Sequence, residues 1–77
     1  MNNYSKFIKT CKMFNQRVLV LEGNDHVGCK LIKHTAYHTN NPTVTFYVWF
    51  NDKYKVYTEG EIQKAYDLYN YIIYKNT

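Results

Sequence analysis

Residues 44–50 read VTFYVWF, the stretch of this chain with the strongest tendency to form a β-strand. The preceding residues 39–43 read TNNPT, a run that breaks regular structure. The next three residues, 51–53, predict a hairpin loop, and residues 54–57 predict the returning strand. This hairpin therefore places a β-sheet at the centre of the fold.

Two more strands are predicted on the N-terminal side of the hairpin. Residues 17–22 read RVLVLE, a short apolar run rich in aliphatic residues. A turn at residues 23–26 separates this run from a longer predicted strand at residues 27–38.

A helix is predicted at each end of the chain. Residues 4–15 carry apolar side chains at helical spacing, and either Ser5 or Asn3 is the expected cap. A capping box from Thr58 to Glu61 predicts a second helix over residues 59–74. The expected fold is a single α+β domain over residues 1–77. In it a four-stranded antiparallel meander is flanked by an N-terminal and a C-terminal helix, both covering one face.

Side-chain alternation predicts two unlike faces on the central hairpin. A three-residue loop would pair Phe50 with Tyr54 and Val48 with Val56. The face expected to pack against the helices then carries Val44, Phe46, Val48, Phe50, Tyr54 and Val56. The opposite face carries Thr45, Tyr47, Trp49, Lys55 and Tyr57, and is extended by Lys30, His34 and His38. This second face mixes aromatic and basic residues, which is typical of a half-exposed surface.

The second face provides the first candidate binding site. Its members are Tyr47, Trp49, Lys55, Tyr57, Lys30 and His34. Its rings could stack on nucleic-acid bases while the lysines approach the phosphates. The same rings could instead stabilise a small sheet through cross-strand pairs, or be covered by a partner protein. A secondary basic face, Lys6, Lys9, Lys12 and Arg17, could contact phosphates or remain solvated.

Catalytic and metal chemistry receive little support from the sequence. The spacing of His26, Cys29, His34 and His38 loosely fits a zinc site, but a strand directs Cys29 and His34 to opposite faces. Cys11 and Cys29 are expected to be reduced core residues. The carboxylates are scattered, and no glycine-rich phosphate loop is present. We therefore expect no metal, no cofactor and no enzymatic activity.

The composition bounds the partners and the compartment. A net charge of +4 and a pI of about 9.1 are compatible with a polyanionic partner, and equally with a role in solubility alone. The N-terminal residues contain no continuous apolar segment of the kind found in a signal peptide, and no apolar run approaches the length of a membrane span. We therefore expect an intracellular, cytoplasmic protein without a membrane partner.

The abundance of Asn, Lys and Tyr predicts an AT-rich genome. In size and composition alone, the chain resembles small proteins of phages and mobile elements. This resemblance implies a non-enzymatic, anti-defence-like inhibitor or modulator of a host protein or nucleoprotein complex, acting in the cytoplasm of an infected cell. The alternative is direct binding of single-stranded nucleic acid at the aromatic-basic face, and a homodimer is left open as a further arrangement.

Overall fold

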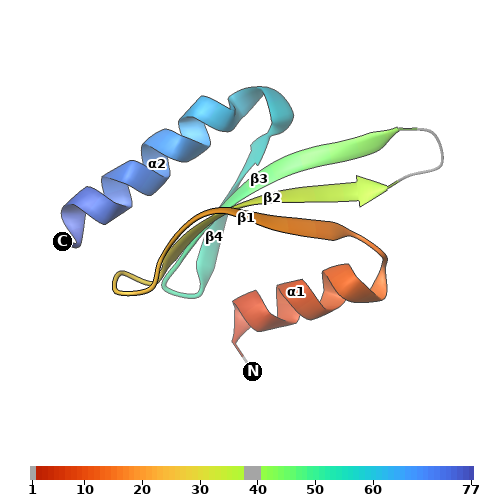
Figure 1. Cartoon of the computed structure of the whole chain (residues 1–77), viewed down its shortest axis with the longest axis horizontal. Helices are drawn as coiled ribbons and strands as arrows, with labels where there is room; N and C mark the ends of the chain where they lie inside the picture. The colour runs from red at the N-terminus through yellow and green to blue at the C-terminus, as the bar shows by residue number, and fades with distance from the viewer. Residues whose placement is uncertain (1, 38–40) are drawn as a thin grey trace.

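The computed structural model describes residues 2–37 and 41–77 and places a β-sheet between two helices (Figure 1). The elements are α1 (Asn3–Met13), β1 (Arg17–Asn24), β2 (Cys29–Tyr37), β3 (Pro42–Phe50), β4 (Lys53–Thr58), a 3₁₀ turn η1 (Glu59–Glu61) and α2 (Ile62–Lys75). The strands form one antiparallel sheet in the order β1-β2-β3-β4. The predicted α+β class, the order of elements and the meander are therefore confirmed.

The two helices lie on opposite faces of the sheet, so the expectation that both cover one face is wrong (Figure 1). Strand β2 explains the difference, because its adjacent residues Leu31 and Ile32 point to opposite faces and both are fully buried. A strand that is apolar on both faces needs a covering layer on each side.

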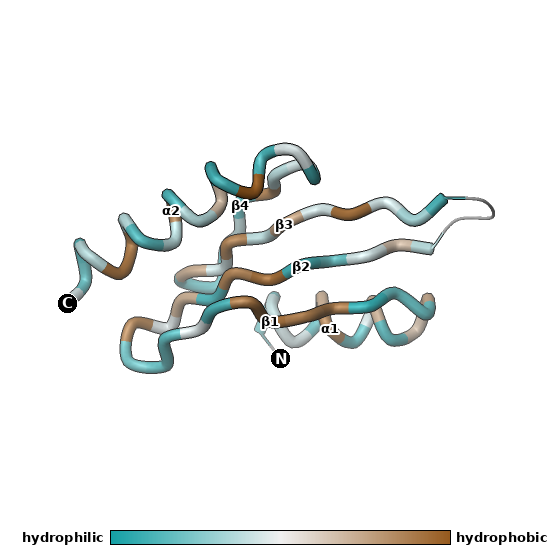
Figure 2. Tube along the Cα trace, turned by 45° about the horizontal axis from the view of Figure 1, so that its top comes forward, coloured by the Kyte–Doolittle hydropathy of each residue, from teal (hydrophilic) through white to brown (hydrophobic). Residues whose placement is uncertain are grey.

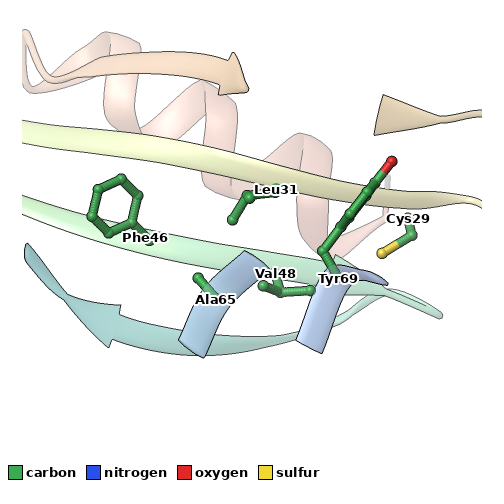
Figure 3. Packing of buried hydrophobic residues seen from close by; sticks show 6 residues of the cluster. All are labelled: Cys29, Leu31, Phe46, Val48, Ala65 and Tyr69. Atoms are coloured by element: carbon green, nitrogen blue, oxygen red, sulfur yellow. The ribbon is translucent and has the colours of Figure 1, made fainter. Parts of the chain in front are cut away.

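One core lies between the sheet and α2 (Figure 3). Its buried members are Cys29 and Leu31 of β2, Phe46 and Val48 of β3, and Ala65 and Tyr69 of α2. Residues Cys29, Leu31, Phe46 and Val48 alternate along their strands, and Ala65 and Tyr69 lie one helical turn apart. This face matches the apolar side of β3 expected from the sequence.

A second, aromatic layer lies between the sheet and α1. It consists of Tyr4 and Phe7 of α1, His34 of β2, Tyr47 and Trp49 of β3, and Tyr54 of β4. The closest pair is Phe7 and Tyr47, whose ring centroids are 4.7 Å apart, and Tyr4 meets Trp49 edge-on at 5.3 Å. These distances are typical of favourable aromatic pairs, so α1 closes a face that the sequence left half exposed.

The hairpin between β3 and β4 has a two-residue turn, and the predicted three-residue loop is wrong. Asn51 and Asp52 both have positive φ, 52° and 60°, as a type I′ turn requires. Phe50 therefore pairs with Lys53, and every residue of β4 changes face relative to the predicted register.

Short polar contacts fix the helix ends. The side chain of Asn2, and not that of Ser5 or Asn3, caps α1 by accepting the Ser5 N–H at 2.7 Å. The predicted capping box before α2 is present, and the Glu61 carboxylate accepts the Thr58 N–H at 2.9 Å. None of the helices in the described residues is both long enough and apolar enough to cross a membrane.

Candidate functional site: the groove between α1 and β1

The aromatic-basic face predicted from the sequence is not assembled as an open surface. Trp49 is only 4% exposed beneath Tyr4 and Phe7, and Tyr47 is partly buried beside the same helix. Burial raises the pKa of the Tyr47 hydroxyl. Base stacking on Trp49 is therefore blocked while α1 is in place.

Two members of the predicted site lie on the other side of the sheet. Lys55 pairs with Val48 and Tyr57 pairs with Phe46, so both side chains are on the α2 face. Tyr57 packs against the α2-side core, and the Lys55 ammonium lies 5.8 Å from its ring centroid. Their separation from Tyr47 and Trp49 follows directly from the shorter hairpin turn.

Lys30 and His34 do share a face with Tyr47 and Trp49, as predicted, but α1 covers that face and both side chains contact other residues there. The Lys30 ammonium lies 4.9 Å from the Tyr4 ring centroid. His34 is buried, with Nε2 2.8 Å from Gln16 Oε1 and Nδ1 3.2 Å from Thr45 Oγ1. Burial lowers the pKa of His34, which favours its neutral form.

The candidate zinc ligands are separated as strand alternation predicts. Cys29 lies in the α2-side core, whereas His34 lies in the aromatic layer, and His38 is outside the described residues. No cluster of three or more potential metal ligands occurs within residues 2–37 and 41–77. Cys11 and Cys29 are buried free thiols, and burial raises the pKa of each.

Three residues of the secondary basic face lie beside a groove between α1 and β1 or its continuation along α1. The groove has a volume of about 430 Å³, and its apolar walls are Tyr4, Ile8 and Cys11 of α1 with Val18 and Val20 of β1. Lys12 and Arg17 stand on its border. A shallower hollow of about 290 Å³ continues along α1 to Lys9 and shares Tyr4, Ile8 and Lys12 with the groove.

The charged residues that line the groove and its continuation are all basic. Among the described residues, none that lines the groove or its continuation along α1 is acidic. The first 21 residues of the chain carry four of its ten basic residues and none of its six acidic ones. Of the four basic residues, Lys9, Lys12 and Arg17 border the groove or its continuation, whereas Lys6 does not. This charge distribution favours an anionic ligand.

A second hollow of about 310 Å³ lies near the β3–β4 turn and has mixed charge. Lys30, Asp25 and Asp52 all line it. The Asp52 carboxylate is already engaged, because it accepts the N–H groups of Asn3 and Tyr4 at 3.0 and 3.2 Å. The indole N–H of Trp49 has no hydrogen-bond partner within the described residues, but it is closed to solvent. This hollow therefore carries no clear preference for a ligand.

The basic residues of the groove were predicted from the sequence, but Val18 and Val20 were not. Both valines face α1, opposite His34 and Ile32 of β2, and Val20 is 48% exposed. The signal was present in residues 18–21, VLVL, because an uncharged aliphatic run on a terminal strand of a meander lies at a sheet edge. Figure 2 shows this apolar segment of β1 along the edge beside α1. Comparisons of the chain with protein-family models, with curated proteins and with solved structures gave no match.

Proposed function

We propose that this chain is a small non-enzymatic binding protein that modulates an acidic partner protein docked in the groove between α1 and β1. The observation that carries the proposal is the combination of apolar walls, including the half-exposed Val20, with a border of Lys9, Lys12 and Arg17. An apolar centre with a charged rim is the usual anatomy of a protein interface.

Direct nucleic-acid binding is the second candidate and has less support. Single-stranded nucleic acid is gripped by exposed aromatic platforms beside cations. Here Trp49 is buried under α1, and Lys55 lies on the opposite face. The groove itself presents the aliphatic side chains of Ile8, Val18 and Val20, which suit apolar side chains of a protein better than stacked bases.

A non-catalytic role is supported by the state of the nucleophilic groups. Raised thiol pKa values keep Cys11 and Cys29 protonated, and thiols are weak nucleophiles. The His34 ring nitrogens lie within hydrogen-bond distance of Gln16 and Thr45, so His34 does not activate either thiol. The small size and the Lys- and Asn-rich composition suit the proposed inhibitor or modulator of a host protein.

The proposal is tested by NMR titration with three anionic probes. The first is an extended octapeptide that alternates glutamate and valine, the second a helical peptide with acidic and leucine faces, and the third an oligothymidylate. We expect at least one of the two peptides to shift the amide signals of Ile8, Lys12 and Val18, with weaker binding at higher salt.

Charge reversal supplies the matched control. Lys12→Glu combined with Arg17→Glu should reduce peptide affinity by about tenfold or more, because attraction becomes repulsion. Lys53→Glu combined with Lys75→Glu changes the net charge by the same amount at distant exposed sites and should have a much smaller effect. Binding of oligothymidylate alone at the groove would instead support the nucleic-acid alternative, and binding of none of the probes would refute both.

A further inference from the structure

The hydrogen-bonding alternation of the sheet determines which groups of β1 face outward. A two-residue turn makes its flanking residues, Phe50 and Lys53, a hydrogen-bonded pair. In an antiparallel sheet such pairs alternate along each strand. The registers of the three strand pairs carry this alternation from the turn across β3 and β2 to β1. They place the backbone groups of Lys33 and Thr35 in hydrogen bonds with those of Leu19 and Arg17 of β1.

The intervening residues of β1, Val18 and Val20, therefore direct their N–H and C=O groups away from β2. β1 is the terminal strand of the sheet, so these groups lie along a free edge. The side chains of Val18 and Val20 line the groove. The same two residues thus offer backbone hydrogen bonds at the edge and apolar contacts beside α1.

The other face of this edge has similar chemistry. A hollow of about 340 Å³ lies there beside the half-exposed Leu19, bordered by Arg17 and Lys33. Within the described residues, no acidic side chain lines this hollow. A strand added to β1 would direct alternate side chains to the two faces. Each face provides an apolar hollow with a cation of its own, Lys12 on one face and Lys33 on the other, and Arg17 borders both hollows.

The opposite edge of the sheet is protected in a way that β1 is not. By the same alternation, β4 directs the backbone groups of Tyr54 and Val56 outward. These residues alternate with the exposed Lys53 and Lys55, and lysines on an edge strand discourage pairing with further strands. Residues 18–21 of β1 contain no charged residue, and the bulge between Val20 and Glu22 limits the open stretch to Arg17–Val20.

We infer that β1 accepts an extended acidic segment of a partner protein as a fifth strand of the sheet. The inference rests on the proposed function and specifies how the groove is used. Main-chain hydrogen bonds to Val18 and Val20 supply affinity, while apolar and acidic side chains in the two hollows supply specificity. A second copy of this chain suits the edge poorly, because each copy would bring Lys12 and Arg17 against those of the other.

The test uses the alternating octapeptide and two versions of it, each N-methylated at every second residue so that one or the other edge of the peptide is blocked. N-methylation removes amide donors along one edge of the peptide and leaves its charge and side chains unchanged. Fluorescence anisotropy should show about tenfold weaker binding of the version methylated on the edge that pairs, as expected for the loss of several hydrogen bonds. Hydrogen exchange of the Val18 and Val20 amides should slow on binding of the unmodified peptide.

A matched pair of variants tests the same inference from the protein side. Val20→Pro removes an outward N–H without loss of a ladder bond, and proline is tolerated at such edge positions. Val56→Pro makes the same change on β4 at a valine of nearly equal exposure, 45% against 48%. Val20→Pro should weaken peptide binding by about tenfold, and Val56→Pro by less than about twofold. Dispersed NMR spectra establish that both variants are folded.

The outcomes separate this inference from the function on which it rests. If only the helical acidic peptide binds, or if both methylated forms bind as well as the parent, strand addition is overturned while the proposed function stands. If neither acidic peptide binds, both fail. If Val20→Pro abolishes self-association seen by sedimentation of the protein alone, the edge is an interface between copies and the inference is overturned.

Discussion

Trp49 is a buried core residue and not the exposed contact residue that the sequence predicted. Its ring meets Tyr4, Phe7 and Tyr54, and its indole N–H lacks a partner within the described residues. Trp49→Ala should cost about 3–5 kcal/mol of unfolding free energy, as large-to-small core changes do. Chemical denaturation measures this cost, and a value below about 1 kcal/mol would show that the aromatic layer contributes little to stability.

Trp49→Phe is the matched comparison at the same site. It keeps an aromatic ring between Tyr4 and Phe7 and removes a buried donor that has no acceptor. Because an unsatisfied buried donor is costly, the loss of ring area is partly offset. We therefore expect Trp49→Phe to be clearly more stable than Trp49→Ala.

His34 should make the stability of the protein depend on pH. Burial lowers its folded-state pKa, so the unfolded chain takes up a proton at a pH where the native protein does not. The contribution of neutral His34 is complete above the unfolded-state pKa of about 6.5, and is lost as the pH falls toward the folded-state value.

The His34 contribution is measured by urea denaturation at about pH 7.5 and pH 5.5. His34→Gln should flatten the decline in unfolding free energy between these conditions, whatever its effect at neutral pH. His26→Gln, which removes an exposed imidazole in the β1–β2 turn, is the matched control. The same decline in the wild type and in His34→Gln would contradict this assignment.

The β3–β4 turn both sets the register of β4 and holds the first residues of α1. Asn51 and Asp52 share a positive φ, a conformation that glycine adopts without strain. The Asp52 carboxylate also accepts the N–H groups of Asn3 and Tyr4, at the positive end of the α1 dipole.

A pair of glycine substitutions separates these two roles of the turn. Asn51→Gly should stabilise the protein by up to about 0.5–1 kcal/mol, because it relieves backbone strain. Asp52→Gly relieves similar strain but leaves the first N–H groups of α1 without their acceptor, so it should destabilise the protein. Thermal melts of both variants test this, and equal stabilisation by the two would show that the Asp52 contacts are unimportant.

The helices and strands were largely predictable, whereas the sheet face on which each helix and each β4 side chain lies was not. The β3 run, the breakers and the capping box at Thr58 are local signals, and local chemistry was sufficient to locate them. The turn at Asn51 lacked the glycine that marks most two-residue hairpins, so one residue of loop length was misassigned. That error moved Lys55 and Tyr57 to the wrong face of the predicted site.

The basic residues of the candidate site were predictable from the sequence, but the groove was not. Lys12 becomes a neighbour of Val20 only because α1 crosses to the face opposite α2, whereas Arg17 lies on the same strand as Val20. That choice depends on both faces of β2 being apolar, and no cap or turn motif encodes it. Adjacent Leu31 and Ile32 were the signal that could have revealed it.

The two covering layers should differ in stability. α2 contributes two buried residues to the α2-side core, Ala65 and Tyr69, whereas α1 has one buried residue, Cys11. Segments with few buried contacts open at lower free energy than the rest of a domain. Native-state hydrogen exchange should therefore show α1 amides opening well below the global unfolding free energy, and α2 amides opening close to it.

Opening of α1 would uncover Trp49 and Tyr47 while the α2-side core stays intact. A chain that begins at Gln16 should therefore retain dispersed β-sheet signals, and its Trp49 fluorescence should become red-shifted.

A chain that ends at Thr58 should instead lose its fold, because Phe46 and Val48 would lose the helix that covers them. If α1 and α2 amides exchange with the same opening free energy, the two layers form one cooperative unit, and the aromatic layer becomes accessible only by global unfolding.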